Sequence, residues 1–373
     1  MSSIISYFDY NATHPPFKEV LESNYQKYLV EYYNPSGSSR FSLKRQSAIE
    51  EVRGYIANLT KKKKESILFC STGTEANHIL LGYVFQSNLF KEGTYVSPFE
   101  HSSMYGALEV FGIPYTIIKG TREGVISLDD LEEKMKSSPR PVITLLAANE
   151  TGVIQPHLEI GKLCEKSNMP FLSDLMQAFC KLDFSFSHIT GFTFSGHKIG
   201  GGMGAAVVCL PDSIKSDFKI FKGGNQENGN RAGTENSNAI ENLMGACVLQ
   251  LNSLIEKNEK LFSFKKSIED NLNDLGATIL SQNVERLPST TFAILPIEDI
   301  DFVLMGLEEK GIIISTGSSC KSRAREASPS LLNMGYSKEE ALRAIRVSTG
   351  YFTTEEEVLD LNKNINNLVK ILA

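Results

Sequence analysis

The sequence lacks the features that mark membrane, secreted and nucleic-acid-binding proteins. No apolar run approaches the roughly 18 residues of a membrane span, and the N-terminus, MSSIISYFDYNATHPP, has neither the basic nor the apolar region of a secretion signal. Lysine plus arginine number 38 against 44 aspartate plus glutamate, a net charge of −6, with no basic strip interleaved with aromatic residues. We therefore expect a cytoplasmic protein that binds neither a membrane nor nucleic acid directly.

Cysteine is scarce, and its spacing shows no pairs. Six cysteines in 373 residues predict reduced thiols and no disulfide framework. Cys320 alone lies in a Gly/Ser loop, TGSSCKS, with Lys321, Arg323 and Arg325 just beyond it. Because positive charge favours the thiolate, Cys320 is either a nucleophile on a movable loop or an inert surface thiol.

Segments of strand type alternate with helical patterns through most of the chain, without tandem repeats. Such alternation is typical of parallel strands with helices on both faces. The strand-type segments are 66–70, 94–98, 115–120, 142–148, 171–174 and 191–195. After about residue 236 the pattern changes to one or two long helices, followed by a mixture of strands and helices. We predict an α/β fold with a mostly parallel sheet, a large domain over 13–255, and a smaller α+β domain formed by 1–12 and 256–373.

A lysine stands where one apolar strand pattern ends. In the segment 192–204, FTFSGHKIGGGMG, Lys198 follows the strand and precedes a glycine cluster that a ligand can approach closely. A lysine on a rigid element in a partly dry pocket loses its proton more easily and can form a Schiff base with an aldehyde cofactor. The alternative is that Lys198 caps the strand and lies in water.

Polar residues follow the other strands, where ligands bind in α/β sheets. Ser71-Thr72-Gly73-Thr74 begins a predicted helix and is either a phosphate site or an ordinary helix cap. His101 follows the segment 94–98, and its ring either stacks on a planar cofactor or has no ligand.

Three further positions carry chemistry. Asp174 ends the segment 171–174, with Gln177 one helical turn later; its carboxylate either holds a pyridinium nitrogen or caps the next helix. Asn149 heads a polar turn after a buried run, and Arg346 either clamps a substrate carboxylate or forms a structural salt bridge. The loop 223–236, GGNQENGNRAGTEN, carries Arg231 and Thr234 toward a ligand, a neighbouring subunit or solvent.

These motifs together resemble those of one enzyme family. They run in order over nearly the full length as YFDYNAT, STGTEAN, EHSS, ANETGVIQP, SDLMQA, SGHK, GGNQENGNRAGTEN, GSSC, IRVSTG and FTTEEE. The set resembles the NifS/IscS-like cysteine desulfurases, pyridoxal-phosphate enzymes of aminotransferase class V. The resemblance implies the type I fold of pyridoxal-phosphate transferases, a homodimer, pyridoxal 5'-phosphate as cofactor, and no metal.

The resemblance also implies a role for each position. Lys198 looks like the Schiff-base lysine, His101 like the stacking and catalytic histidine, Asp174 like the pyridinium partner, and Gln177 like the donor to the phenolic oxygen. Residues that resemble further cofactor contacts, most of them to the phosphate, are Gly73, Thr74, Asn149, Ser195, His197 and, from the other subunit, Thr234.

The substrate site and the reaction follow from the same resemblance. Asn149 and Arg346 match the site of the substrate carboxylate, and Cys320 matches the sulfur acceptor. The expected reaction converts L-cysteine to L-alanine and leaves a persulfide on Cys320, on a mobile loop that delivers sulfur to an iron–sulfur scaffold or a tRNA-thiolation protein. The distance along the chain from Cys320 to Arg346 resembles that of the long-loop NifS/IscS subgroup.

Two alternatives stay open at this point. A selenocysteine lyase, or another class V lyase or aminotransferase, uses the same cofactor. A non-catalytic pyridoxal-phosphate protein that binds a partner is the second alternative, and only the stretch IGGGMG after Lys198 favours it. That stretch is shorter than in relatives and has no proline, so we expect subunit packing or substrate access to differ there.

Overall fold

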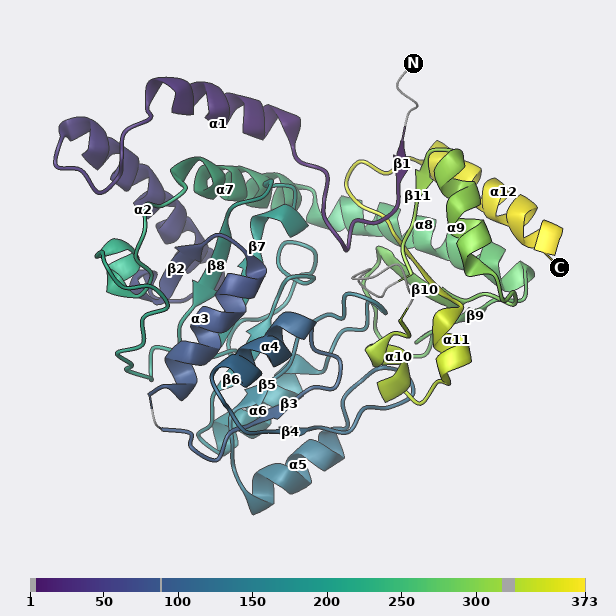
Figure 1. The fold of residues 1–373 in the computed structure, drawn as a ribbon, viewed down its shortest axis with the longest axis horizontal. Coiled ribbons are helices and arrows are strands. Elements are labelled where there is room, and N and C mark those ends of the chain that lie inside the picture. The colour runs from purple at the N-terminus through teal and green to yellow at the C-terminus, as the bar shows by residue number, and fades with distance from the viewer. Residues whose placement is uncertain (1–4, 88, 317–325, 373) are drawn as a thin grey trace.

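The computed structural model describes residues 5–87, 89–316 and 326–372, and Figure 1 shows its fold. Its centre is a sheet of seven strands in the order β2-β8-β7-β6-β5-β3-β4. In chain order these strands are β2 (Ile67–Cys70), β3 (Thr94–Val96), β4 (Tyr115–Ile117), β5 (Val142–Ile143), β6 (Phe171–Asp174), β7 (Gly191–Ser195) and β8 (Ala206–Cys209).

Most neighbours in this sheet are parallel. The exception is β8, which runs antiparallel to both β2 and β7 and lies between them. The remaining pairs, from β7 through β6, β5 and β3 to β4, are parallel. The predicted α/β fold with a mostly parallel sheet is therefore confirmed, and the carboxyl ends of its parallel strands lie along one edge.

Apart from its edge strand β4, the sheet is buried on both faces, because its strands alternate apolar side chains between two cores. In β2, Ile67 and Phe69 belong to one core, whereas Leu68 and Cys70 belong to the other. This pattern is typical of a sheet covered by helices on both sides.

Helices cover the two faces unequally. One face packs against α3 (Gly73–Phe85) and α4 (Ser102–Val110). The other packs against four helices, namely α2 (Arg40–Thr60), α5 (Leu128–Ser137), α6 (His157–Lys166) and α7 (Ser237–Asn252). Helix α1 (Lys18–Val30) lies beside α7, outside both layers, and has no buried residue (Figure 1).

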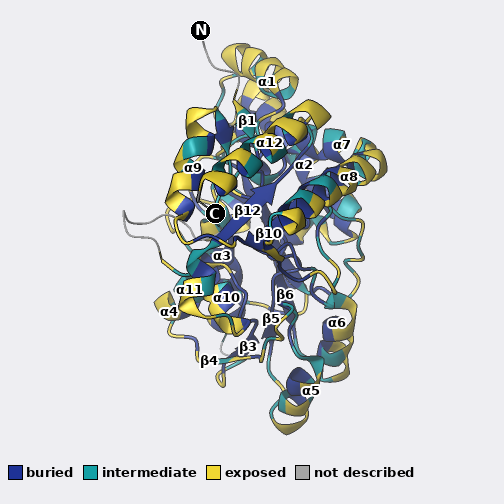
Figure 2. Ribbon diagram, turned by 90° about the vertical axis from the view of Figure 1, so that its right-hand side faces the viewer, coloured by how far each residue is buried: buried dark blue, intermediate teal, exposed yellow. Residues whose placement is uncertain are grey.

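A second, smaller sheet stands beside the first. It is antiparallel, in the order β12-β10-β9, and comprises β9 (Thr278–Ile279), β10 (Thr290–Ile294) and β12 (Ala344–Ser348). Figure 2 shows β10 and β12 buried among helices. Those helices are α8 (Leu254–Asp274), α9 (Ile300–Glu309) and α12 (Glu355–Leu372), and the short α10 (Pro329–Asn333) and α11 (Lys338–Leu342) lie nearer the large sheet.

The N-terminus returns to this smaller region. Strand β1 (Ser6–Tyr7) pairs in parallel with β11 (Ile312–Ile313). Phe8 packs in the same core as α8, α9 and α12, separate from the two cores of the large sheet. This separate core supports the division that we propose, with one domain over 13–255 and the other over 1–12 and 256–373.

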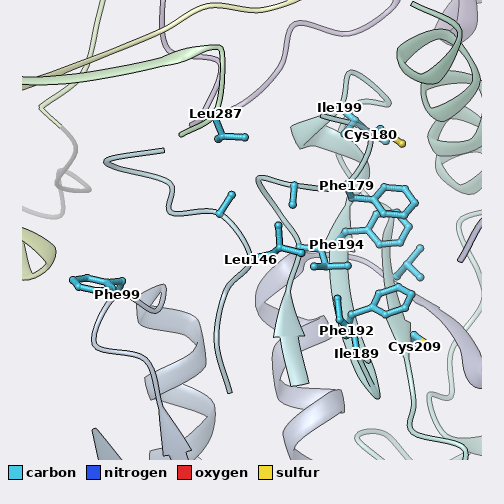
Figure 3. Close-up of a cluster of buried hydrophobic side chains, with 14 of the residues drawn as sticks. Phe99, Leu146, Phe179, Cys180, Ile189, Phe192, Phe194, Ile199, Cys209 and Leu287 are labelled. Atoms are coloured by element: carbon cyan, nitrogen blue, oxygen red, sulfur yellow. The ribbon is translucent and has the colours of Figure 1, made fainter. Parts of the chain in front are cut away.

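Strand β7 is backed by stacked aromatic rings. Phe179 and Phe194 lie face to face, with ring centroids 3.6 Å apart and planes 12° apart, and Phe192 lies nearby (Figure 3). Close packing of this kind holds a strand rigidly. Rigidity matters here because Lys198 follows directly on β7.

The helices of the described residues include none that is both long and apolar enough to cross a membrane.

Candidate active site

A pocket of about 510 Å³ opens at the carboxyl ends of the parallel strands. Its volume is in the range of small-molecule and cofactor sites. Side chains from the ends of several strands, from the start of α3 and from the smaller domain meet in it. Residues singled out in the sequence that line it are Gly73, Thr74, His101, Asn149, Asp174, Gln177, His197, Lys198 and Arg346.

Lys198 is placed by a tight turn. Strand β7 ends at Ser195, and a 3-10 turn over Gly196–Lys198 follows. Gly200 then adopts φ +93°, and a Cβ there would lie 2.7 Å from the ring of Phe17. Only glycine combines this conformation with so close an approach, so the chain can turn against Phe17 two residues after Lys198.

The surroundings of Lys198 make its ammonium easier to deprotonate than that of an ordinary lysine. Its Nζ donates to the carbonyl oxygens of Asn11 at 2.6 Å and Ala12 at 2.8 Å. Burial and then the charge of Arg346 lower the pKa of Lys198 to about 8, although Asp174 and Asp9 oppose the shift. The group therefore has a substantial neutral fraction near neutral pH, which an ordinary lysine lacks.

Asp174 is the last residue of β6, and Gln177 lies in the turn that follows. One carboxylate oxygen of Asp174 accepts from the backbone N–H of Met176 at 2.8 Å. The alternative that Asp174 caps the next helix is wrong, because residues 175–190 form turns and contain no helix. Gln177 donates through Nε2 to the carbonyl of Asn11 at 2.8 Å and accepts through Oε1 from Lys181 at 2.6 Å. Both side chains are buried and face the pocket.

Arg346 reaches the pocket from β12. Its guanidinium donates to the carboxylate of Asp9 at 2.6 Å and to the carbonyl oxygen of Asn149 at 2.9 Å. Arg346 therefore forms the structural salt bridge that the sequence left open, and this ion pair lies inside the pocket. The Nε atom of Arg346 is buried and has no hydrogen-bond partner in the described part of the chain. This arrangement leaves donor capacity for an incoming carboxylate.

The start of α3 forms one wall. Thr72 is its N-cap and accepts from the backbone N–H of Glu75 at 3.1 Å, whereas Gly73 and Thr74 occupy the first turn. The backbone N–H groups of a first helical turn, together with the helix dipole, attract anions. Opposite, His101 caps α4, and its Nδ1 accepts from the backbone N–H of Ser103 at 3.2 Å.

Other predicted residues stand apart from the pocket or outside the described residues. Ser195 is buried next to it, with its hydroxyl 3.4 Å from the carbonyl oxygen of Ala205. Thr234 is exposed on the loop 223–236 and does not line the pocket of its own chain. Cys320 falls in the segment 317–325, which lies outside the described residues.

His197 lies beside Lys198 and lines the pocket. Its Nδ1 lies 3.2 Å from the hydroxyl of Thr13. Burial first, and then the nearby Lys198 and Lys181, lower the pKa of His197 to about 4. The imidazole is therefore neutral at neutral pH and suited to hydrogen bonding, not to ion pairing.

Several lining residues were not assigned from the sequence, and four of them carry polar side chains from the N-terminal third of the chain. These four are Asp9, Asn11, Asn77 and Ser103. All four lie within the motifs YFDYNAT, STGTEAN and EHSS. These motifs could have indicated that the four residues belong to the site. They could not have indicated that Asp9 pairs with Arg346 across 337 positions of sequence.

Comparison with known proteins agrees with this geometry. Residues 6–361 match the family of class-V aminotransferases. A protein of Clostridium botulinum named cysteine desulfurase IscS is 30% identical over 364 residues, which cover 94% of this chain and 91% of that protein.

Solved structures agree as well. A NifS-like protein from Rickettsia africae superposes with a TM-score of 0.87 at 29% identity, covering 98% of this chain and all of that one. The protein SspA, solved in complex with cysteine, superposes with a TM-score of 0.79 at 27% identity, covering 94% of this chain and 100% of its own. The chain therefore belongs to the class-V aminotransferase family, with the type I fold, and is similar over most of its length to cysteine desulfurases.

Proposed function

We propose that this chain is a pyridoxal-phosphate-dependent cysteine desulfurase. It would convert L-cysteine to L-alanine and move the sulfur to Cys320 as a persulfide. The observation that carries the proposal is one pocket that holds a lysine with a pKa of about 8 beside Asp174, Gln177 and Arg346. The names of the similar proteins support the same activity.

The donor set fits pyridoxal 5'-phosphate. Lys198 supplies an amine for its aldehyde, Asp174 a carboxylate for its ring nitrogen, and Gln177 an amide for its phenolic oxygen. The helix start at Gly73 and Thr74 suits its phosphate. When bound, this cofactor withdraws electron density from the Cα of an amino acid.

The remaining contacts follow the resemblance and are part of the proposal. His101 would stack on the ring, with Asn149 beside the cofactor. Ser195 and His197 would complete the phosphate site beside β7, and Thr234 would reach it from a second copy of the chain. The exposure of Thr234 outside its own pocket supports such a contribution.

The residues of the chain divide the work between binding and proton transfer. Arg346 and Asn149 would hold the carboxylate of L-cysteine, since the guanidinium is already oriented by Asp9. The neutral amine of Lys198 would take the proton from the substrate Cα and return a proton to the product. His101 lies at the rim and would serve as a further acid–base group.

Cys320 would accept the sulfur. Its thiol and L-cysteine would give L-alanine and an enzyme persulfide, because an S–S bond forms as the substrate C–S bond breaks. The electron pair of the broken bond stays on the substrate carbon, which then takes up a proton. A protein that receives sulfur, such as an iron–sulfur scaffold or a tRNA-thiolation protein, would consume the persulfide.

A homodimer in the cytoplasm is the proposed working state. Helices α1 and α2 and the turn between them expose large apolar side chains, including Tyr25, Leu29, Val30, Tyr32, Phe41 and Leu43. A patch of this kind supports a protein–protein interface. The five cysteines among the described residues are free thiols, which supports a reducing compartment.

Product analysis with Cys320→Ala tests the proposal. We expect the purified protein to release equal amounts of alanine and sulfide from L-cysteine with a thiol reductant, and Cys320→Ala to lose this activity by orders of magnitude. Cys164→Ala is the matched control, because Cys164 is buried in α6 away from the pocket. Full activity of Cys320→Ala on L-cysteine would show that Cys320 is not the acceptor.

The same assay distinguishes the alternatives. Activity on selenocysteine that survives Cys320→Ala would favour a selenocysteine lyase. Bound pyridoxal phosphate without turnover of any amino acid would favour a non-catalytic binding protein.

A further inference from the structure

Asn77 lies in the second turn of α3 and contacts two sides of the pocket at once. It is 1% exposed. Its Nδ2 donates to the carboxylate of Asp174 at 3.1 Å and to the hydroxyl of Ser103 at 3.0 Å. The hydroxyl of Thr193, in β7, donates to Oδ1 of Asn77 at 2.6 Å. Every polar atom of this buried amide is therefore paired.

Thr193 determines which way the amide of Asn77 points. The Thr193 hydroxyl is fully buried and donates to Oδ1, so both N–H bonds of Nδ2 are directed at Asp174 and Ser103. In the reversed orientation the amide oxygen would face the Asp174 carboxylate, and two acceptors would be forced together. The Thr193 hydroxyl and the Asp174 carboxylate thus select the same orientation.

Ser103 passes this constraint on to His101. The backbone N–H of Ser103 can only donate, and it lies 3.2 Å from Nδ1 of His101, so Nδ1 presents a lone pair. The Ser103 hydroxyl accepts from Asn77 and lies 2.8 Å from the same Nδ1, to which its own hydrogen is donated. The imidazole is therefore neutral, with its proton on Nε2. The start of α4 beside the ring also disfavours a positive charge.

We propose that Asn77 is a positioning residue that holds the Asp174 carboxylate and, through Ser103, the Nε2–H tautomer of His101. The inference rests on the proposed function, because it takes Asp174 and His101 as contacts of pyridoxal phosphate. One amide, oriented by Thr193, then holds the Asp174 carboxylate that partners the ring nitrogen of the cofactor. Through Ser103 the same amide acts on the protonation of the His101 ring, which stacks on the cofactor. Neither role requires Asn77 to touch the cofactor.

Two substitutions test the role of the amide. Asn77→Leu removes the amide, and Thr193→Val removes only the hydroxyl that orients it, whereas Thr193→Ser keeps that hydroxyl. We expect pyridoxal phosphate to bind about tenfold more weakly to Asn77→Leu and severalfold more weakly to Thr193→Val, because hydrogen bonds to a buried charge are lost or misdirected. Thr193→Ser should bind as the wild type does.

The nitrogen resonances of the His101 ring report its hydrogen bonding directly. They would not change if Asn77 contributed to stability alone. In the full-length protein labelled with ¹⁵N-histidine, the signals of His101 are those that disappear in His101→Asn. In the wild type these signals should show the Nε2–H tautomer. Asn77→Leu and Thr193→Val should shift the Nδ1 resonance of His101, because the Ser103 hydroxyl is then free to turn away and only the backbone N–H of Ser103 still donates to Nδ1. Thr94→Val is the matched control, because its buried hydroxyl donates to the carbonyl of Pro141 at 2.8 Å, far from the pocket.

The outcomes separate this inference from the proposed function. Wild-type His101 resonances and wild-type cofactor affinity in Asn77→Leu and Thr193→Val would overturn it. If Asn77→Leu does not fold, the comparison of Thr193→Val with Thr193→Ser decides by itself. Failure of the wild type to bind pyridoxal phosphate would refute the proposed function, whereas the His101 tautomer would still support or overturn the role of Asn77.

Discussion

The amine of Lys198 lies among charges that act in opposite directions. Burial and Arg346 favour the neutral form, whereas Asp174 and Asp9 favour the ammonium. Asp9 is itself paired with Arg346 at 2.6 Å, so each of these two charges partly screens the effect of the other on Lys198. The pKa of about 8 is the balance of these effects.

The first prediction concerns the pH dependence of cofactor uptake. Only a neutral amine attacks an aldehyde, and the lowered pKa means that Lys198 is protonated below about pH 8 and neutral above it. The initial rate at which the cofactor-free protein takes up pyridoxal phosphate should rise with pH and level off above about 8. Stopped-flow measurement of the visible absorbance follows this directly.

Two variants should move that midpoint in opposite directions. Arg346→Gln removes a repelling cation and should raise the midpoint, whereas Asp9→Asn removes a carboxylate and should lower it. A wild-type rate that keeps rising toward 10.5, the ordinary pKa of lysine, would contradict the prediction.

At the scale of single residues, chemical type and position after a strand singled out Lys198 and Asp174, whereas Arg346 was singled out by its chemical type after a helical segment. Their partners were not accessible in the same way. Asn77 meets Asp174 across 97 positions of sequence, and Asn11 meets Thr290 across 279. Such contacts join segments that come together only when each domain folds, and no local pattern in the sequence encodes them.

At the scale of elements, the start of α3 combines a structural cap with a proposed anion site. Thr72 caps the helix through its hydroxyl, whereas Thr74 is exposed in the first turn. Glu75 would repel an anion there, but its carboxylate is paired with Arg231 at 2.8 Å and accepts from the backbone N–H of Ser71 at 2.8 Å. The first turn is therefore left with its own positive dipole end.

The second prediction separates these two threonines. Thr72→Ala should lower the free energy of unfolding by about 1 kcal/mol through loss of the cap, and Thr72→Ser should restore it. Thr74→Ala should leave stability within about 0.5 kcal/mol but weaken pyridoxal phosphate binding severalfold. Urea unfolding and fluorescence titration measure the two quantities. If Thr74→Ala lowers the free energy of unfolding by as much as it weakens the free energy of cofactor binding, Thr74 contributes to the helix alone.

The elements that the sequence predicts best are those with strong periodicity and clear ends. Strands β2, β6 and β7 fall within the apolar runs expected, and the long helical pattern after residue 236 resolves into α7 and α8, with a break at Ser253. Helix α1 was not assigned, because its apolar residues do not gather on one face. Strand β8 follows the glycine cluster directly, and β12 follows a helical segment. Neither was predicted as a strand, because only their pairing partners identify them as such.

At the scale of the whole molecule, a buried polar network joins segments from both domains. Lys257, in α8, donates to Oε1 of Gln250 at 2.6 Å, which directs the amide nitrogen of Gln250 toward Nε2 of His14 at 3.1 Å. The same nitrogen donates to the carbonyl of Ile199, just after Lys198, at 3.0 Å. The other ring nitrogen of His14 donates to the carbonyl of Pro15 at 2.5 Å.

This network requires a neutral His14. A proton on its Nε2 would face the N–H of Gln250, whose orientation Lys257 holds. Burial, opposed in part by the Pro15 carbonyl, lowers the pKa of His14 to about 3 from 6.5. Between these two values the unfolded chain binds a proton that the native protein does not bind, so stability falls as the pH falls below about 6.5.

Acid should therefore destabilise the protein through His14. At pH 5, His14 alone should lower the free energy of unfolding by about 2 kcal/mol relative to pH 7. His14→Gln, which does not titrate, should remove that part of the difference, whereas His78→Gln, on the outer side of α3, should retain it. Urea unfolding at the two pH values measures it for all three proteins. An unchanged difference in His14→Gln would mean that acid acts elsewhere, and His197, with its pKa of about 4, would be the next residue to substitute.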